Sequence, residues 1–301
     1  MLYFFQQLLN GVHSAAIYGL LAFGYALGNG LLKRTNLAYG GVFAFCGQTM
    51  ILAAVYGYQA LWLTLPATIA FGIAIALAYA AFFSRLLSRA VFAPLAGRSP
   101  NAIVAATLGV LLVLMELSRI AADTHDYWLP PMLSTPVVFA SNGSFAVTLT
   151  IIQLINTAIA AAVIIFGALL LAHSNFGRHW RAVADDPFAA KLCGIDTSHV
   201  FHRALLFGGL CAGLAGVLAA LYYGNLGFGA GLVYGLKILF ITAVGGYYAP
   251  GRAAVGAAAF GLSEALWAGY FPIEWRDAWM YGLLAAMLVL TGDRKDAPSL
   301  V

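Results

Sequence analysis

Charged residues are scarce in this sequence. The 301 residues include 15 Lys and Arg and 11 Asp and Glu, together 9% of the chain, whereas soluble domains carry about 25%. Apolar residues make up 62% of the chain and mean hydropathy is +0.89. A soluble protein of this length could not remove so much apolar surface from water, so the composition predicts a polytopic membrane protein. The net charge of +4 is not gathered into a basic run, and no nucleic-acid partner is expected.

Patterns that carry chemistry are also lacking. The three cysteines are odd in number and lie in or beside apolar segments, without the spacing of a disulfide framework or a metal site. Nothing matches the phosphate-binding pattern GxxxxGK[ST], so the chain itself is not expected to hydrolyse nucleotide. Ser263 lies in GLSEA, which lacks the second glycine of a nucleophile elbow. We therefore predict no catalytic residue, no metal and no cofactor.

Long apolar segments, in contrast, are abundant, and most approach the roughly 20 residues that a membrane-spanning helix needs. They lie at about residues 8–30, 36–58, 61–83, 101–121, 146–172, 200–222, 231–248, 253–271 and 277–291. Because the segment at 231–248 is short and rich in glycine, it either spans or re-enters the membrane. The predicted fold is an all-α integral membrane protein with eight or nine transmembrane helices, some broken or re-entrant, forming one domain over residues 1–301.

The distribution of basic residues predicts the orientation. With residues 174–199 placed in the cytoplasm and the segments alternating, 12 of the 15 Lys and Arg fall on the cytoplasmic side, and only Arg119, Lys237 and Arg276 do not. The N-terminus is then outside and the C-terminus cytoplasmic. Residues 123–145 become an external loop, and prolines in it suit a rigid extended cover.

Residues 174–199 form the one long polar stretch among the apolar segments. Gly177 is expected to end the helix before it, and a short helix is expected to follow. Asp186 followed by proline is typical of a helix N-cap, and Gly194 stands where a second short helix needs a left-handed residue. The stretch therefore predicts two short surface helices that end at a glycine, although composition alone also suits an ordinary solvated loop.

Polar residues within the apolar segments are costly in a bilayer and usually face a bundle interior or an aqueous path. Lys237 and Glu264 are the strongest candidates for lining such a path, with a structural hydrogen bond as the alternative. Glu116 and Arg119 are three residues apart and are expected to pair on one helix face. Other polar residues in these segments, Asn36, Gln153 and Asn156, suit either the path or hydrogen bonds between helices.

Four stretches carry motifs that cover most of the chain. They are residues 6–32, which open the first helix; NLAYGG at residues 36–41; FGRHWRAVADDPFAAKLCGID at residues 176–196; and the segment from GLK to EAL at residues 235–266. Together they resemble the inner-membrane permease subunits of branched-chain amino acid ABC importers, a group that includes urea and short-amide permeases. NLAYGG is similar to the NFAHGE motif of that family.

The resemblance implies a bacterial inner-membrane permease without a catalytic centre of its own. Its expected partners are a second related permease, two ATPase subunits, a periplasmic solute-binding protein and the lipid bilayer. The polar stretch would be the segment that couples to the ATPase. The residues expected to make that contact are Arg178, Arg181, Asp185, Asp186 and Gly194, and those expected to line the translocation path are Asn36, Tyr39, Lys237 and Glu264.

Several functions stay open at this point. Tyr39 replaces the histidine of NFAHGE and Gly41 replaces its glutamate, so urea, short amides, or aromatic or carboxylate solutes are alternatives to branched-chain amino acids. A secondary transporter would work as a single gene product without ATP. An integral-membrane enzyme would need a nucleophile and base, or a metal cluster, at membrane depth, and the sequence predicts neither.

Overall fold

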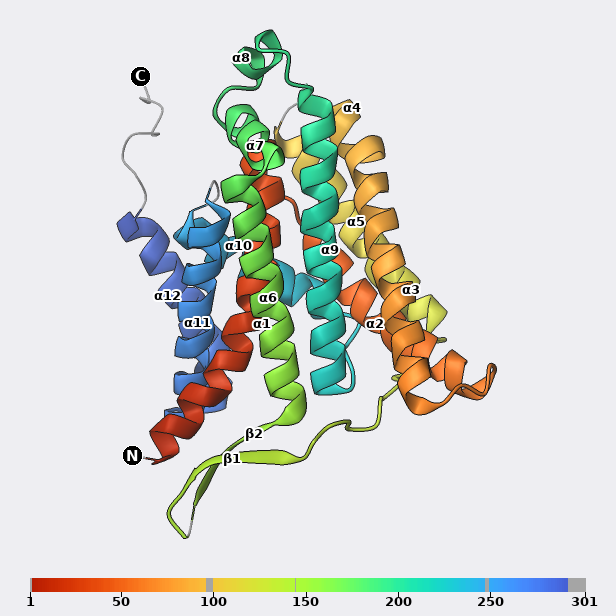
Figure 1. Cartoon of the computed structure of the whole chain (residues 1–301), viewed down its shortest axis with the longest axis vertical. Helices are drawn as coiled ribbons and strands as arrows, with labels where there is room; N and C mark the ends of the chain where they lie inside the picture. The colour runs from red at the N-terminus through yellow and green to blue at the C-terminus, as the bar shows by residue number, and fades with distance from the viewer. Residues whose placement is uncertain (1, 96–99, 144, 247–248, 292–301) are drawn as a thin grey trace.

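The computed structural model describes residues 2–95, 100–143, 145–246 and 249–291. The elements in chain order are α1 Leu2–Leu32, α2 Ala38–Gln59, α3 Leu65–Leu86, the π-helix η1 Leu87–Phe92, α4 Ala93–Leu95, α5 Pro100–Ala121, β1 Pro136–Ser141, β2 Ala146–Thr150, α6 Ile151–His173, α7 Asn175–Asp185, α8 Pro187–Leu192, α9 Thr197–Tyr223, α10 Ala230–Gly245, α11 Pro250–Tyr270, the 3₁₀-helix η2 Ile273–Trp275 and α12 Arg276–Thr291. The long helices run roughly side by side in a bundle (Figure 1).

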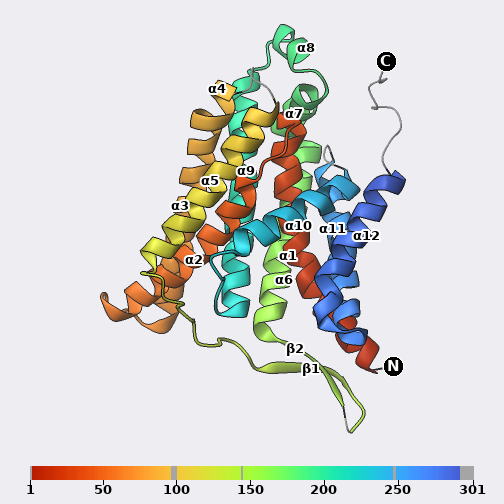
Figure 2. The same cartoon turned by 180° about the vertical axis from the view of Figure 1, so that it is seen from behind.

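The two ends of the bundle differ. The surface helices α7 and α8 project from one end, whereas the hairpin of β1 and β2 and the beginning of α1 lie at the other (Figure 1). Viewed from behind, α10 crosses the bundle obliquely between α2 and α11 (Figure 2). The polar segment around α7 and the hairpin segment are thus on opposite sides, as the predicted alternation requires.

Three helices, α1, α2 and α9, form the buried centre of the bundle. Small residues let their backbones approach closely, which is how helices gain contact without an apolar driving force in lipid. A Cβ atom on Gly216 of α9 would overlap the carbonyl oxygen of Phe43 on α2. Gly24 of α1 and Gly208 of α9 are equally close, since a Cβ atom on either would lie within 3 Å of the other's carbonyl oxygen. Only glycine allows these crossings.

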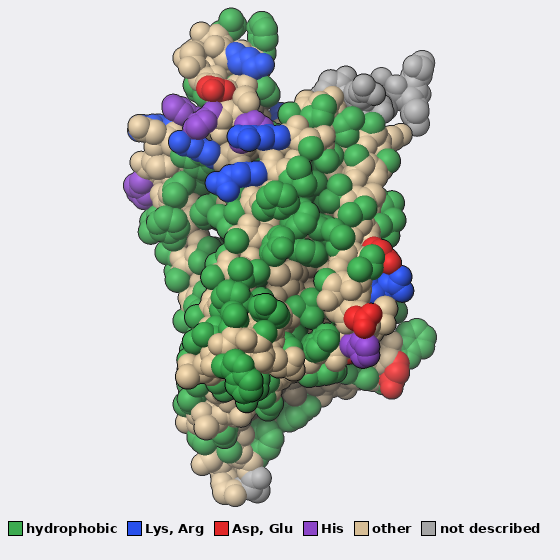
Figure 3. Space-filling view, turned by 90° about the vertical axis from the view of Figure 1, so that its right-hand side faces the viewer, with side chains coloured by type: hydrophobic (Ala, Val, Ile, Leu, Met, Phe, Trp, Pro, Cys, Tyr) green, Lys and Arg blue, Asp and Glu red, His purple; other side chains and the backbone are tan. Residues whose placement is uncertain are grey.

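Helices α3, α5 and α6 are largely exposed on their outer faces, and the exposed side chains are mostly apolar. Figure 3 shows a broad hydrophobic band on one face, with Lys and Arg side chains above it at the end that carries α7 and α8. Six helices among the described residues, α1, α2, α3, α5, α6 and α9, have the length and hydropathy to cross a membrane. The predicted all-α membrane architecture is confirmed at this level.

The predicted number of eight or nine spans stays a prediction. All nine predicted segments contain helices, but the 16 residues of α10 reach only about 24 Å, less than the roughly 30 Å of a hydrocarbon core. The oblique course of α10 agrees with this short length (Figure 2). The predicted cytoplasmic residues Arg98, Arg294 and Lys295, and the C-terminus itself, lie outside the described residues.

Two sequence-based boundaries were wrong. The segment predicted to be helical from residue 146 begins as strand β2, and α6 starts only at Ile151, because Thr150 and Gln153 form a capping box there. Strand β2 pairs with β1, so the predicted external loop supplies the first strand of a hairpin that extends past residue 145. Gly177 does not end α6; Ser174 caps α7, and Gly177 lies within α7 against the backbone of Leu171.

The close α2–α9 crossing yields a test. We expect Gly216→Leu to destabilise the bundle by roughly 3 kcal/mol or more, because the side chain has no space against Phe43. The matched control is Gly109→Leu on the exposed face of α5, where a Cβ atom would meet nothing within 4 Å. The measurement is thermal unfolding of the detergent-purified chain. Equal melting temperatures for the two variants would contradict the crossing.

Candidate functional site

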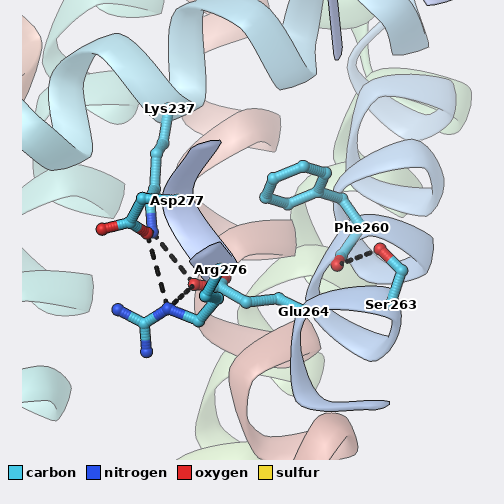
Figure 4. A network of polar contacts seen from close by, with 6 residues as sticks. All are labelled: Lys237, Phe260, Ser263, Glu264, Arg276 and Asp277. Atoms are coloured by element: carbon cyan, nitrogen blue, oxygen red, sulfur yellow. Dashed lines mark hydrogen bonds and ion pairs between the residues drawn. The ribbon is translucent and has the colours of Figure 1, made fainter. Parts of the chain in front are cut away.

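A cluster of four charged side chains joins the three C-terminal helices (Figure 4). Lys237 of α10 places its Nζ atom 2.9 Å from Glu264 Oε1 of α11 and 3.1 Å from Asp277 Oδ1 of α12. Arg276, the first residue of α12, places its Nε atom 3.5 Å from the same oxygen of Glu264 and 3.4 Å from that of Asp277. The two cations and two carboxylates balance in charge.

Burial divides this cluster into an inner and an outer pair. The side chains of Lys237 and Glu264 are 5% and 11% exposed, whereas those of Arg276 and Asp277 are 35% and 50% exposed. Removing ions from water costs several kcal/mol each, and mutual attraction offsets this only when the charges stay paired. The inner pair therefore depends on its partners, and the cluster is accessible from the side of α12.

The structure thus brings together Lys237 and Glu264, two of the residues predicted to line a path. Their direct contact also suits the structural alternative that the sequence left open. Arg276 and Asp277 were not predicted as members of the cluster. Their adjacency at the start of the last apolar segment was visible in the sequence, but nothing local indicates that they face a lysine 40 residues earlier in the chain.

The other predicted path residues, Asn36 and Tyr39, lie elsewhere. Both line a cavity of about 20 Å³ between α1, α2, α3 and α9, which has room for about one water molecule. Tyr39 donates its hydroxyl to the carbonyl oxygen of Leu21 at 2.9 Å, and the buried Oδ1 atom of Asn36 has no hydrogen-bond partner among the described residues. This cavity includes neither Lys237 nor Glu264, so the four residues form two separate pairs.

Two further expectations are confirmed. Glu116 and Arg119 form an exposed ion pair on α5. Asn156 and Gln153 join α6 to α9, since the Nδ2 atom of Asn156 donates to the carbonyl oxygen of Leu218 at 2.9 Å and the Nε2 atom of Gln153 donates to the Tyr222 hydroxyl at 3.2 Å. These four polar residues are explained by contacts within and between helices.

The polar stretch folds as two capped surface helices. Ser174 caps α7 by accepting a hydrogen bond from the N–H of Gly177. Asp186 caps α8, accepting from the N–H groups of Phe188 and Ala189, with proline at the first helical position. Asp196 then caps α9. The predicted cap at Asp186 is therefore confirmed, and α7 is longer than the short helix that the sequence predicted.

Helix α7 is held firmly against the bundle. Trp180 is 4% exposed, and its indole Nε1 donates to the carbonyl oxygen of Leu27 on α1 at 3.0 Å. Val183 is buried beside it, against the beginning of α9. Arg181 donates its Nη1 atom to the carbonyl oxygen of Leu171 at 2.7 Å, which fixes the corner between α6 and α7. An ordinary solvated loop would lack these contacts.

Helix α8 presents apolar side chains to the outside. Phe188 is 71% exposed and Leu192 is 75% exposed, and their spacing of four residues places them on one face of the helix. Sequence reasoning missed this pair because it weighed only the charges of a polar stretch. Among the predicted contact residues, Asp186 uses its carboxylate in the cap and Arg178 donates to Asn175, whereas Asp185 is exposed on α7.

Gly194 ends this element in the predicted left-handed conformation. Its φ is +79°, and a Cβ atom there would meet nothing within 4 Å. The position therefore favours glycine for its backbone conformation and not for space.

A family profile described as "Branched-chain amino acid transport system / permease component" matches residues 7–291. The chain belongs to this family. The match spans the buried helices, the charged cluster and the surface helices alike. The permease family therefore accounts for nearly all of the described structure, and the chain is a multi-pass membrane protein.

Individual permeases agree with the family assignment. LivH of Salmonella typhimurium, a high-affinity branched-chain amino acid transport system permease protein, is 28% identical over 295 residues, which cover 96% of this chain and 94% of LivH. BraD of Pseudomonas aeruginosa, of the same description, is 26% identical and covers 95% and 94%. A solved chain of PsaBC from Streptococcus pneumoniae, in complex with Fab, is 13% identical, covers 93% and 89%, and has a TM-score of 0.45, which is too low to support an argument.

The charged cluster predicts how its members depend on one another. Glu264→Gln leaves two cations facing one carboxylate, so we expect a loss of stability of about 3 kcal/mol or more. Asp277→Asn should cost less than about 1 kcal/mol, because that side chain is half exposed. The double variant Lys237→Met with Glu264→Gln should regain much of the loss, since no deeply buried charge is left unpaired.

Thermal unfolding measures these stabilities, and uptake measured in parallel tells the two roles of the pair apart. A stable double variant with little uptake is the expected result for a pair that lines the path. A stable double variant with full uptake would show that Lys237 and Glu264 serve the fold alone.

Proposed function

We propose that this protein is the permease subunit of an ATP-driven ABC importer that moves branched-chain amino acids across the inner membrane. The observation that carries the proposal is the family match over residues 7–291, which leaves no long part of the chain for another activity. Residues 1–301 act as a single transmembrane permease domain. ATP is hydrolysed by a separate partner, and this subunit needs no cofactor.

We assign coupling to α7 and α8. A partner that binds ATP can shift the permease between two conformations of its path only through a contact that transmits the partner's movement. The pair is suited to this because Trp180 anchors α7 on α1 while Phe188 and Leu192 stay exposed beyond the bundle. Their apolar side chains would occupy a cleft on the ATPase. Asp185 and Arg178 would supply charge at the rim of that contact.

We assign solute recognition to the charged cluster. An α-amino acid carries one ammonium and one carboxylate group, and the cluster offers carboxylates and cations within 3.5 Å of one another. Exchange of the Lys237–Glu264 contact for contacts to the solute would keep every charge paired, which limits the desolvation cost. Asn36 and Tyr39, with their small cavity, belong to a second region of the same path.

An uncharged or differently charged solute is the second candidate. The glutamate of the NFAHGE motif is absent here, and its place is taken by Gly41. A Cβ atom on Gly41 would already lie 3.1 Å from Leu111 and 3.3 Å from Leu114 of α5, so a larger side chain has little room. This local change supports urea, short amides, or aromatic or carboxylate solutes as alternatives to branched-chain amino acids.

The proposed complex contains a second related permease, two ATPase subunits and a periplasmic solute-binding protein. The distribution of basic residues supports a cytoplasmic position for α7 and α8 and an external position for the hairpin. The N-terminus is then periplasmic and the C-terminus cytoplasmic, in a bacterial inner membrane. The hairpin of β1 and β2 lies on the side where the binding protein would arrive (Figure 1).

Native cysteines provide the test of this orientation. Cys193, at the end of α8, is exposed, whereas Cys46 and Cys211 are buried. A membrane-impermeant maleimide should therefore label the wild-type chain only after the inner membrane is opened. In a Cys193→Ser background, Ser141→Cys on β1 should label in intact cells. The reverse pattern at both positions would show that the orientation is inverted.

Reconstituted transport tests the function together with the coupling element. The complete complex should take up leucine with ATP, and excess urea or phenylalanine should compete poorly. In Gly194→Val, a β-branched residue must adopt the left-handed backbone conformation, which costs it more than about 1 kcal/mol. Because this strain is confined to position 194, the membrane helices should stay intact. Uptake and solute-stimulated ATP hydrolysis should both fall at least about tenfold, because α8 loses its orientation.

Gly194→Asn is the matched control, since asparagine tolerates the left-handed conformation and should keep most of the activity. If Gly194→Val formed the complex in normal yield and kept full solute-stimulated ATP hydrolysis, α7 and α8 would only connect α6 to α9. If urea competed as strongly as leucine, the protein would still be an importer, but its solute would be urea and not a branched-chain amino acid.

A further inference from the structure

A cleft of about 730 Å³ opens where the end of α1, the surface helix α7 and the beginning of α11 meet. Its wall includes Trp180, the residue that anchors α7, and Pro250, the first residue of α11. Asp185, proposed above for the ATPase contact, lies on its wall, but the cleft itself has no role in that proposal. The end of α1, helix α7 and the beginning of α11 all lie toward the end of the bundle that carries the surface helices (Figure 1).

Cations from three distant parts of the chain converge on this cleft. Lys33 follows α1, Arg181 lies on α7 and Arg252 lies in the first turn of α11, whereas Asp185 supplies the one carboxylate of the lining. No ion pair among the described residues includes any of these three cations, so the cleft keeps an excess of positive charge. Lys33 is held at a φ of +49°, a conformation uncommon for a residue other than glycine.

The first turn of α11 adds to this positive field. No side chain caps the helix, since Ala249 stands at the N-cap and makes no side-chain hydrogen bond there. The free N–H groups of a first turn and the positive end of the helix dipole favour an anion, although a helix end alone would not define a site. Here they face the same cleft as the three cations.

The surface below the cleft is apolar. Helices α6 and α11 flank α1 on the outside of the bundle (Figure 1). Val255, 71% exposed, lies one helical turn from Arg252 on α11, and Ala168 is exposed one turn from Leu171 on α6. A ligand that fills the cleft with its charged part would therefore extend along hydrocarbon-facing side chains.

We propose that this cleft binds the phosphate headgroup of an anionic phospholipid, with the acyl chains lying along α6 and α11. The two arginine side chains match phosphate oxygens in geometry as well as in charge. Basic pockets between membrane helices recognise lipid headgroups in this way. Because Arg181 and Trp180 belong to α7, the bound lipid would tie the surface helices to α11 as well as to α1.

The test counts lipids bound to the purified full-length chain by native mass spectrometry. Phosphatidylglycerol should bind more tightly than phosphatidylcholine. The double variant Lys33→Gln with Arg252→Gln should weaken phosphatidylglycerol binding roughly 10- to 30-fold, since each basic residue near an anionic lipid surface contributes about fivefold in affinity. Arg181 is left unchanged because it holds the α6–α7 corner.

The matched control is Arg85→Gln with Arg89→Gln, which removes two exposed cations that lie at the same end of the bundle but outside the cleft. It should change lipid binding less than about twofold. If the double variant of the cleft folds poorly, the single variant Lys33→Gln should still lose about fivefold.

Four results would overturn the assignment. Equal binding of the two lipids, or an equal loss in the control variant, would show that the cleft has no selectivity for anionic lipid. Displacement of the lipid by glycerol 3-phosphate at equal concentration would make it a site for a soluble phosphate compound. Loss of the ATPase subunit from the Lys33 and Arg252 variant, with unchanged lipid binding, would assign the cleft to that protein partner.

Discussion

The close contact of α9 with α1 and α2 is the constraint on which the rest of the molecule depends. Lipid tails are as apolar as leucine, so burial of apolar surface does not hold membrane helices together, and shape must do so. At Gly216 and Gly208 the backbones themselves touch. The polar surface helices are continuous with the rod fixed by these contacts, since α8 leads through Gly194 directly into α9. The glycines inside the bundle thus help to fix where α8 is held relative to the membrane helices.

The charged cluster and the small cavity accommodate polar side chains within the bundle in different ways. Lys237 and Glu264 pair with each other and with the outer charges of Arg276 and Asp277, so the inner charges stay compensated. Asn36 and Tyr39 instead border a space for about one water molecule. Lys237, Glu264 and Tyr39 are thereby buried within the bundle, whereas Asp277 is half exposed. Along the proposed path, a solute would meet two environments, one ionic and one neutral.

Local chemistry explains which features could be predicted from the sequence. The Asp186–Pro187 cap and the left-handed Gly194 each depend on two or three neighbouring residues, and the sequence contains these in full. The existence of the long helices could be predicted in the same way, from the length of the apolar segments. Helix boundaries that depend on side-chain contacts were harder to predict. At the start of α6, Thr150 forms a capping box and also pairs with β1, so the apolar character of the segment could not show where the helix begins.

Contacts between distant residues could not be predicted. The sequence indicated that Lys237 and Glu264 were unusual, but not that Asp277 completes the pair from another helix. It also gave no reason to separate Asn36 from Lys237. Phe188 and Leu192 are a different case, because the spacing was visible while exposure was not. An apolar residue in a polar stretch packs inward as readily as outward, and only the fold of α7 against α1 settles which it does.

The length of α9 gives the molecule a mechanical property. At 27 residues it is a rod of about 40 Å, joined to α8 at one end and, through the hydrogen bond from Leu129 to Gly224, to the segment before the hairpin at the other. Gly208 and Gly216 hold it against α1 and α2 between these two ends. A tilt of α9 about these contacts would move its two ends in opposite directions. A movement of α8, the proposed contact with the ATPase, would therefore be transmitted along α9 to the segment before the hairpin.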